Sequence, residues 1–468
     1  MVKQYVKRII PNEGQKQALE LMKEFNQSKV SKEFCLDGSG GTGKTTIIRE
    51  LFLKKAVMDD KPKTVTKPKK NSKKVKKKLS GVKDIFEDEM YYVPKNVIGV
   101  TVSHKARMVL NEQLPNCITY AAAVNMTTEF DAWGEMVFVP RYGEFRQSVL
   151  YKYKYIVFDE ASMVSDEMRE ILQMSCAPGA KIIYLGDHAQ LPPIKPKTGD
   201  YNPDDDSSVF SLNDHYTLTE KMRQNEGDHI STLCDTVRLH IDGDRDISWI
   251  KDIKQMYDPQ TKKGYSFSSE DKVIKSFVNN YNDGVDCRIT AYRNKRIDYL
   301  NNMVRMNLFG AKAKEPYVLG DLIVGNDMYN PNNDLNPIFY NGEDMIIEQI
   351  YDSEVNDIQC YQLWAKHKKM PIYVVKDCDM NKYYSIISEL KAKALKSKLW
   401  QEYMTFKNNY ANISYGYAVT LYKIQGSTLY GCYVDMHDIF GVKPLSNKRK
   451  LQSIYVGFSR PTNFLAIF

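Results

Sequence analysis

The run Gly38–Thr45 (GSGGTGKT) constrains this chain more than any other feature, because it fits the pattern GxxxxGK[ST] of a phosphate-binding loop. Apolar, strand-like residues 33–37 precede the run, and helix-favouring residues 46–53 follow it. A strand, a glycine-rich turn and a helix N-terminus together place successive backbone N–H groups around an anion. We therefore expect an α/β domain that binds a nucleoside triphosphate.

Each residue type in this loop has a chemical reason to be there. Lys44 supplies a positive charge for the phosphates, and the Thr45 hydroxyl is a ligand for Mg²⁺. ATP and Mg²⁺ are the expected cofactors. The candidate nucleotide-binding residues of the loop are Gly38, Gly40, Gly41, Thr42, Gly43, Lys44, Thr45 and Thr46.

Length and composition favour a multidomain globular protein. The chain has 468 residues, of which 43% are hydrophobic, so we expect two to four domains. No apolar run approaches the roughly 18 residues that span a bilayer, and the first residues lack the apolar core of a signal peptide. We expect no membrane partner and a cytoplasmic location, in the host cell if the source is viral. The eight cysteines form no CxxC pair, which predicts reduced thiols and no structural zinc.

The excess of positive charge is concentrated in one segment. Residues 61–78 contain ten lysines and no acidic residue, whereas the remainder of the chain has 56 basic and 58 acidic residues. Such a segment cannot bury apolar surface, so we predict a disordered insert. It could be a solvated linker, a flexible tether with salt-sensitive affinity for a nucleic-acid backbone, or a nuclear-import signal.

Strand-like and helical stretches alternate in two parts of the chain, which predicts two domains with parallel sheets. The expected strands of the first domain are 33–37, 97–101, 155–159 and 181–185, and those of the second are 288–291, 432–434 and 464–467. Residues 316–410 differ. They contain short β-like runs at 322–324, 344–347 and 371–375, then a Lys-rich helical stretch at 380–405. We expect a small β-barrel with a helical arm, inserted in the second domain.

Polar residues follow two of the first domain's strands. Asp159 and Glu160 end the strand at 155–159, and Gln190 follows the strand at 181–185. Because ligands of such sheets bind at the carboxyl ends of the strands, these residues should meet the phosphate-binding loop. Asp159 then suits a Mg²⁺ site with Thr45, Glu160 suits the base that activates water, and Gln190 could sense the γ-phosphate.

The order of these blocks resembles that of superfamily 1 helicases, and the B subclass of RecD-like and Dda-like enzymes in particular. The resemblance covers nearly the whole chain. It implies two RecA-like P-loop domains, with a hairpin inserted in the first and an SH3-like barrel plus helical arm in the second. The expected bounds are 1–120 and 153–215 for the first domain, 121–152 for the hairpin insert, 216–315 and 411–468 for the second domain, and 316–410 for the barrel and arm.

The resemblance also implies roles for residues outside the phosphate-binding loop. Gln15, in the segment NEGQK, matches the glutamine that reads adenine. Arg223, in LTEKMRQ, should lie near the γ-phosphate, and Arg460, in YVGFSR, matches the arginine finger. Such an arginine can contribute about 10³ to 10⁵ in rate. In the motif at 415–428, Tyr422 and Ile424 replace the usual His and Ser, so the roles of these two positions stay open.

Three segments are candidates for contact with single-stranded nucleic acid. Thr101, Ser103 and His104 resemble a motif that holds DNA phosphates, and Thr420, Lys423 and Gln425 belong to the motif at 415–428. Residues 135–143 could form a hairpin that splits the duplex, with Phe138 as the wedge. The Asn341–Gly342 turn in the inserted region is given no chemical role.

Taken together, these observations predict an ATP- and Mg²⁺-dependent DNA helicase that acts on single-stranded and fork DNA. Polarity from 5′ to 3′, a monomeric state, a single-strand binding protein or other replication proteins as partners, and a role in replication, recombination or repair are implied by the resemblance alone. The alternatives are an RNA-directed or non-unwinding translocase and a nucleotide-regulated single-strand binding protein. A small-molecule kinase would not explain the second α/β domain.

Overall fold

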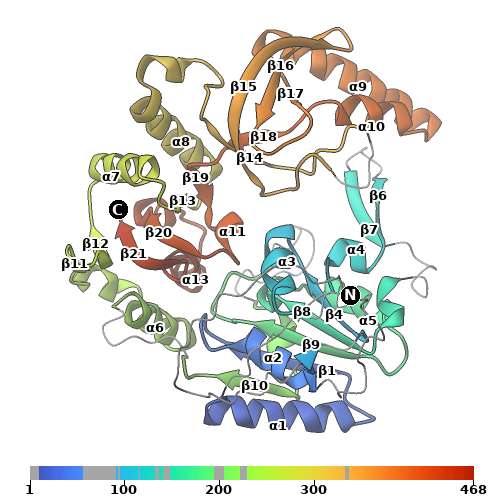
Figure 1. Cartoon of the computed structure of the whole chain (residues 1–468), viewed down its shortest axis with the longest axis vertical. Coiled ribbons are helices and arrows are strands. Elements are labelled where there is room, and N and C mark those ends of the chain that lie inside the picture. Colours follow the sequence, from blue (N-terminus) through green and yellow to red (C-terminus); the bar gives the residue numbers. More distant parts are fainter. Residues whose placement is uncertain are drawn as a thin grey trace, which may run out of the picture.

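The structure is a computed structural model that describes residues 10–55, 91–92, 95–114, 116–131, 136–140, 148–193, 205–221, 229–332 and 337–468. Two α/β domains lie side by side in the lower part of Figure 1, and an inserted antiparallel sheet lies above them. The Lys-rich segment 61–78 and Arg223 lie outside the described residues. Among the helices in these ranges, none combines the length and apolarity needed to cross a membrane.

The first domain is built on a six-stranded sheet with the order β10-β1-β9-β8-β4-β5. All its strand pairs are parallel, so the carboxyl ends of the strands share one edge. The four strands expected from the sequence are confirmed as β1, β4, β8 and β9. The strands are β1 Glu33–Gly38, β4 Val97–Thr101, β5 Cys117–Thr119, β8 Tyr155–Asp159, β9 Lys181–Gly186 and β10 His215–Leu218.

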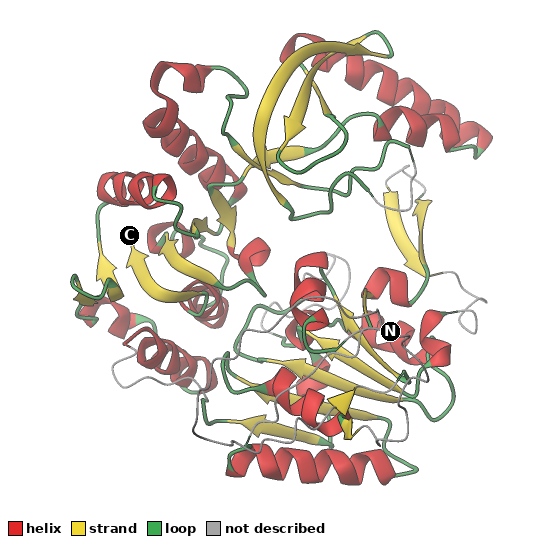
Figure 2. Ribbon diagram, viewed as in Figure 1, coloured by secondary structure: helices red, strands yellow, loops and turns green. Residues whose placement is uncertain are grey.

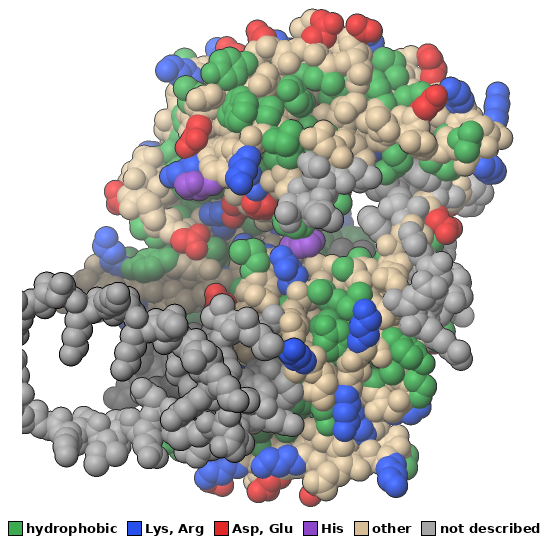
Figure 3. Space-filling view, turned by 45° about the vertical axis from the view of Figure 1, so that its right-hand side comes forward, with side chains coloured by type: hydrophobic (Ala, Val, Ile, Leu, Met, Phe, Trp, Pro, Cys, Tyr) green, Lys and Arg blue, Asp and Glu red, His purple; other side chains and the backbone are tan. Residues whose placement is uncertain are grey.

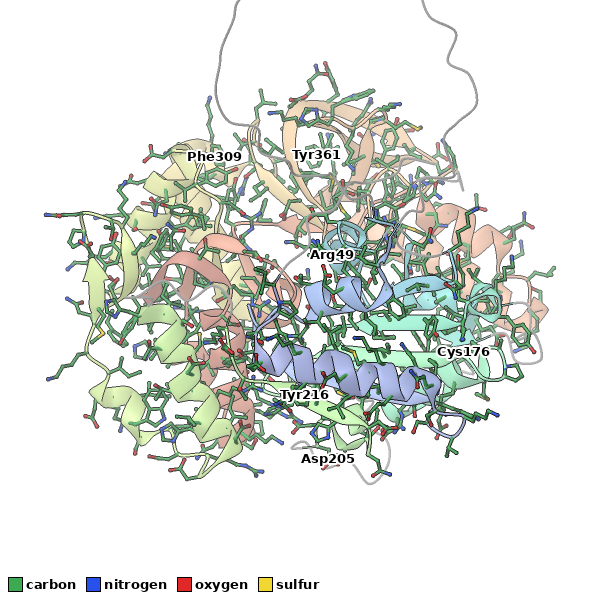
Figure 4. All side chains as sticks on the ribbon, turned by 60° about the horizontal axis from the view of Figure 1, so that its bottom comes forward. Arg49, Cys176, Asp205, Tyr216, Phe309 and Tyr361 are labelled. Carbon is green, nitrogen blue, oxygen red and sulfur yellow. The ribbon has the colours of Figure 1, made fainter. Side chains whose placement is uncertain are left out.

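Helices cover both faces of this sheet (Figure 2). They are α1 Glu13–Gln27, α2 Lys44–Phe52, α3 His104–Asn111, α4 Tyr120–Ala123 and α5 Asp166–Met174. The four inner strands β1, β4, β8 and β9 are buried on both sides, which is why they read as largely continuous apolar runs in the sequence. Helix α1 also covers the sheet edge, where the Tyr216 hydroxyl of β10 donates to Gln17 Oε1 at 2.8 Å (Figure 4).

The second domain has a six-stranded sheet with the order β11-β12-β21-β20-β13-β19, parallel except for β11. The strands are β11 Met256–Asp258, β12 Lys263–Phe267, β13 Cys287–Ala291, β19 Ala418–Thr420, β20 Leu429–Val434 and β21 Pro461–Ile467. The helices are α6 His229–Asp242, α7 Glu270–Asn282, α8 Asn294–Phe309, α11 Leu421–Ile424, α12 Met436–Phe440 and α13 Asn447–Phe458. The expectation of a second α/β domain is confirmed, whereas β12 and β19 were not predicted.

The inserted region contains a five-stranded antiparallel sheet with the order β17-β16-β15-β14-β18. Its elements are β14 Leu322–Gly325, β15 Asp344–Val355, β16 Ile358–Ala365, β17 Ile372–Val375, α9 Met380–Ser397, α10 Gln401–Asn408 and β18 Ile413–Tyr415. A buried ion pair fixes the root of this insert: Arg305 of α8 donates to Asp321 through two nitrogens, at 3.0 and 2.9 Å. The Tyr417 hydroxyl donates to the same carboxylate at 3.0 Å.

The expected hairpin at 135–143 is misplaced. Strand β7 (Met136–Pro140) pairs antiparallel with β6 (Met126–Phe130), so residues 136–140 form only one arm of the hairpin and residues 126–130 form the other. The side chain of Phe138 lies outside the described residues, and its role as a wedge stays a prediction. A second short pair, β2 (Lys54–Lys55) with β3 (Tyr91–Tyr92), brings together the two ends of the segment that contains the Lys-rich tract.

Candidate functional site between the two α/β domains

The phosphate-binding loop connects β1 to α2 at the carboxyl edge of the first sheet. Gly43, the residue before α2, has φ 85°, a left-handed conformation that a residue with a Cβ adopts only with strain. A Cβ on Gly38 would lie 2.8 Å from the carbonyl oxygen of Leu218, so the loop also needs glycine for close packing. The tight turn leaves the first-turn N–H groups of α2 as donors, which is the arrangement that binds phosphate.

Lys44 and Gln15 both bond to this loop. Lys44 Nζ donates to the carbonyl oxygens of Gly38 at 2.5 Å and Ser39 at 3.0 Å. Gln15 is completely buried, and its Nε2 donates to the carbonyl oxygen of Thr42 at 2.9 Å. Its Oε1 accepts from Asn12 N at 3.2 Å in the capping box of α1. Gln15 is therefore placed to position the loop, and its proposed contact with adenine stays a prediction.

Asp159 and Glu160 lie at the end of β8, as expected. Asp159 Oδ1 accepts from the backbone N–H of Glu160 at 2.9 Å. Glu160 has φ 60° and ψ 47°, a left-handed conformation that costs about 1 kcal/mol or more and recurs at functional sites. Burial raises the pKa of both carboxyls, and the neighbouring Asp159 charge helps to raise the pKa of Glu160 to about 7. Glu160 thus has the pKa of a general base that works near neutral pH.

The second domain meets Glu160 through two segments. A Cβ on Gly426 would lie 3.0 Å from Glu160 Oε1, so the chain passes directly beside this carboxylate. Arg460 lies in the connection between α13 and β21, where it donates to the Ser459 hydroxyl at 2.8 Å and to the Val456 carbonyl at 3.1 Å. Its positive charge lowers the pKa of Glu160 and opposes the effect of burial. The structure therefore brings Arg460 near the first domain's carboxylates.

Gln425 lies at the interface between the two domains. Its Nε2 donates to Ser162 Oγ at 3.0 Å and to Gln190 Oε1 at 3.2 Å, and its role on the nucleic-acid track stays a prediction. In this state Gln425 bridges the two domains beside the nucleotide site, next to the expected γ-phosphate sensor. Ser162 was not singled out from the sequence, although it follows Glu160 by two positions.

A buried ionic cluster also joins the two domains. Arg238 of α6 donates to Asp187, which lies just after β9 and accepts from the Tyr455 hydroxyl at 2.6 Å. His188 Nδ1 lies 2.6 Å from Asp37 Oδ2, and its Nε2 lies 2.7 Å from Asp242 Oδ1. Burial lowers the pKa of His188, but the two carboxylates outweigh it and raise this pKa to about 10. The cluster thus contains two cations among three carboxylates.

We assign this cluster to domain contact. Asp37, Asp187 and His188 converge closely enough to ligate a cation, but Arg238, Tyr455 and Asp242 already bond to them.

A second set of contacts extends the interface. Arg449 donates to the Asp205 carbonyl oxygen at 2.8 Å, and Lys448 Nζ lies 2.7 Å from Asp206 Oδ2. Figure 4 labels Asp205 at the lower edge of the molecule.

The candidate track residues fall into two groups. In the first domain, Thr101 is buried and donates to the Ser103 carbonyl oxygen at 2.9 Å, while Ser103 caps α3 by accepting from Ala106 N at 3.1 Å. Thr101 therefore shapes the turn that presents Ser103 and His104. Figure 3 shows the surface hollowed between the first domain and the insert, with Lys and Arg side chains predominating on the lower part of this face.

In the second domain, Thr420 and Lys423 line a cavity of about 370 Å³. Thr420 caps α11, and Lys423 Nζ donates to Asn326 Oδ1 of the insert at 2.8 Å. Burial lowers the pKa of Lys423. The other polar residues that line the cavity are Asn294, Asp298, Asn326, Asn412 and Ser414. The segment 420–426 therefore reaches from this cavity at one end to Glu160 and Gln190 at the other.

A phosphate-binding loop on one parallel sheet, faced by an arginine from a second parallel sheet, defines a two-domain P-loop ATPase. The comparisons with known proteins agree with this class. A family model described as "AAA domain" matches residues 11–254, more than half of the chain. The chain therefore belongs to this AAA domain family.

Individual relatives extend the comparison. An uncharacterised protein of Acanthamoeba polyphaga mimivirus is 26% identical over 375 residues, 66% of this chain and 73% of that protein. The ATP-dependent DNA helicase dda of Enterobacteria phage T4 is 26% identical over 322 residues, 67% of this chain and 60% of that helicase. A solved structure of two coordinating Pif1 helicases at forked double-stranded DNA matches this chain with a TM-score of 0.49 and 12% identity. The match covers 98% of this chain and 92% of the Pif1 chain. The family match and the phage relative confirm the resemblance to superfamily 1B helicases.

Proposed function

We propose that this chain is an ATP-dependent DNA helicase that translocates along single-stranded DNA and unwinds duplex DNA. One observation carries the proposal. The segment 420–426 lines a cavity with Thr420 and Lys423, while Gln425 and Gly426 of the same segment lie against Gln190 and Glu160. A change at the nucleotide site would therefore move the residues proposed to hold the track.

The residues fit ATP and Mg²⁺. The α2 N-terminus and Lys44 would hold the phosphates, and Thr45 and Asp159 would hold Mg²⁺, a cation that prefers oxygen ligands. Bound Mg²⁺ would supply neutralisation of phosphate charge. Glu160 takes a proton from the attacking water, because its raised pKa leaves it able to accept one near neutral pH. Gln190 would sense the γ-phosphate, and Arg460, with Arg223, would stabilise the charge that develops during phosphoryl transfer.

Hydrolysis would be converted to movement at the domain interface. Arg460 now bonds within its own domain, to Ser459 and Val456, so reaching a nucleotide requires these bonds to exchange or the domains to approach. The Gln425–Gln190 hydrogen bond would respond to the same approach of the domains. Gln425 belongs to the segment 420–426, which also contains Thr420. Such closure around a ligand is a common form of domain movement.

Finer properties of the motor rest on the family resemblance. We propose 5′ to 3′ movement, a monomeric motor and fork DNA as the physiological substrate. Association with a single-strand binding protein or other replication proteins, action in replication, recombination or repair, and a host-cytoplasmic location if the source is viral are proposals of the same kind.

Strand separation tests the proposal. The purified chain should separate the labelled strands of a DNA fork in the presence of ATP and Mg²⁺. It should also separate a duplex that carries only a 5′ single-stranded arm. Lys44→Ala should abolish both hydrolysis and separation, since it removes the charge that holds the phosphates, while single-strand binding remains. Lys23→Ala, on the exposed face of α1, is the matched control. Hydrolysis retained by Lys44→Ala would overturn the assignment of the site.

A further inference from the structure

The turn at the tip of the inserted sheet touches the first domain through one pair of rings. Tyr340 lies on the turn that includes Gly342, and its ring stacks on the imidazole of His104 at the start of α3. The ring centroids are 3.9 Å apart and the planes are inclined by 29°. Figure 1 shows α3 on the side of the first domain that faces the insert. The two rings thus come from opposite sides of the proposed track.

Each ring is held by its own domain. His104 follows β4 directly, and the Ser103 cap fixes the first turn of α3. On the other side, the backbone N–H of Tyr340 donates to Glu343 Oε2 at 3.0 Å, and Gly342 N donates to the Gly325 carbonyl oxygen at 2.8 Å. The backbone that carries each ring is thus held within its own domain, so opening the stack does not require either domain to unfold.

The chemistry of His104 favours stacking over ion pairing. Burial, helped by the nearby Arg107, lowers the pKa of His104, and the carboxylate of Glu343 opposes this only in part. The ring is therefore neutral at physiological pH. Within the described part of the chain, the buried Nδ1 of His104 has no hydrogen-bond partner. A buried polar atom without a partner is costly in the free protein, and a ligand that supplies a partner removes this cost.

We propose that His104 and Tyr340 form a two-sided clamp that closes on one base of single-stranded nucleic acid. This inference rests on the proposed function, because it names the position on the track where a base is held. Every base has an aromatic face, so a pair of rings binds bases regardless of sequence, as a motor requires. Admitting a base between the rings roughly doubles their separation, since each face then makes its own stack. The sugar or phosphate of that nucleotide would supply the partner that Nδ1 of His104 lacks.

The clamp also assigns a role to the insert. Tyr340 is carried by a sheet whose root is fixed to α8 by Arg305 and Asp321, and α8 contributes Asn294 and Asp298 to the cavity beside Thr420. Movement of the second domain relative to the first would therefore move Tyr340 relative to His104. The base would be gripped in one state of the nucleotide cycle and released in another.

The test uses the full chain and an oligodeoxythymidylate that carries a single 2-aminopurine, whose fluorescence falls when the base is stacked on an aromatic ring. The label is walked along the oligonucleotide, and affinity is measured by anisotropy. The variants are His104→Ala, Tyr340→Ala and the conservative Tyr340→Phe. Tyr351→Ala, an exposed tyrosine of the same sheet, is the matched control. Far-UV circular dichroism and thermal melting identify any variant that fails to fold.

The clamp predicts quenching of the labelled base that is lost in His104→Ala and Tyr340→Ala and retained in Tyr340→Phe and Tyr351→Ala. Affinity should fall roughly 5- to 150-fold in the two alanine variants, the range expected for one stacked base. An identical quenching profile in all variants would overturn the clamp while leaving the helicase proposal intact. Tighter binding by Tyr340→Ala would also overturn it, because the stack would then be a latch that excludes DNA. Failure of the unsubstituted chain to bind single strands would overturn both proposals.

Discussion

Replacing Arg238 with methionine tests whether the buried ionic cluster holds the two α/β domains together. Methionine preserves most of the side-chain volume and removes the charge. Arg238 is 15% exposed, and its partner Asp187 has a side chain that is completely buried. The substitution therefore leaves a buried carboxylate in the first domain without its cation from the second.

The expected free-energy cost of Arg238→Met follows from the contacts that remain. Arg238 also lies 3.7 Å from Asp37 Oδ2, and a unit charge pair near 4 Å is worth about 4 kcal/mol at an effective dielectric constant of about 20. Removing one partner of a buried pair typically costs about 3 to 5 kcal/mol. In Arg238→Met, Asp187 still accepts from the Tyr455 hydroxyl and Asp37 still contacts His188. We therefore expect a cost at the lower end of this range, about 3 kcal/mol. This cost corresponds to roughly a 150-fold change in the local opening equilibrium.

Hydrogen exchange measured by mass spectrometry reports this opening directly. Amides of β9 and α6 should exchange on the order of 100-fold faster in Arg238→Met, while those of the inserted sheet should be unaffected. Arg245→Met, at an exposed position just beyond α6, is the control. Unchanged protection of β9 and α6 in Arg238→Met would refute the view that this cluster joins the domains.

Two further predictions concern the nucleotide site. Because burial and Asp159 raise the pKa of Glu160 to about 7 from the ordinary 4.5, the folded state binds an extra proton between these values, so stability should fall as pH rises across this window. The kcat/KM for ATP should instead rise through about pH 7 as Glu160 ionises, and a flat profile between about pH 6 and 8 would count against Glu160 as the base. Gln15→Leu removes the bond to the Thr42 carbonyl, at a cost of about 1 to 2 kcal/mol, and should raise KM roughly tenfold. If Gln15 acts only by positioning the loop, ATP and GTP will be weakened equally; a selective loss for ATP would show direct contact with adenine.

Local patterns were enough to predict that the candidate nucleotide-site residues of the first domain lie at one edge of its sheet. Lys44, Asp159 and Gln190 each follow an apolar strand of a parallel sheet, and such a sheet necessarily brings those strand ends to one edge. The strands themselves were found because burial on both faces makes them continuous apolar runs. The same reasoning identified the second α/β domain and the β-rich character of the insert.

The direction in which a side chain points was not available from the pattern. Gln425 and Lys423 belong to one motif, but the chain leaves the short helix α11 at Gln425 with extended backbone, and Gly426 turns it with φ 74°. Lys423 therefore faces the insert while Gln425 faces Gln190. A spacing rule cannot show this reversal. The hairpin was misplaced for a related reason, since the local pattern does not show that residues 136–140 pair with residues 126–130.

The sequence also did not reveal residues whose contact partners lie far away along the chain. Arg238 contacts Asp187 across 51 positions, and Tyr340 contacts His104 from a different domain. Neither Arg238 nor Tyr340 belongs to a periodic or spaced pattern. Asp37, a charged residue that follows the apolar run Phe34–Leu36, is a local signal of the ionic cluster, because a buried carboxylate needs a cation nearby.

The central claim is that residues 420–426 link ATP hydrolysis to the single-stranded track. Steady-state ATP hydrolysis with increasing single-stranded DNA, with matching RNA as a control, tests it most directly when the unsubstituted chain is compared with Gln425→Ala. We expect strong stimulation of the unsubstituted chain by DNA and a ratio of stimulated to basal rate near one in Gln425→Ala. If DNA does not change the rate of ATP hydrolysis by the unsubstituted chain, or if the ratio of stimulated to basal rate is the same in both proteins, residues 420–426 do not link hydrolysis to the track.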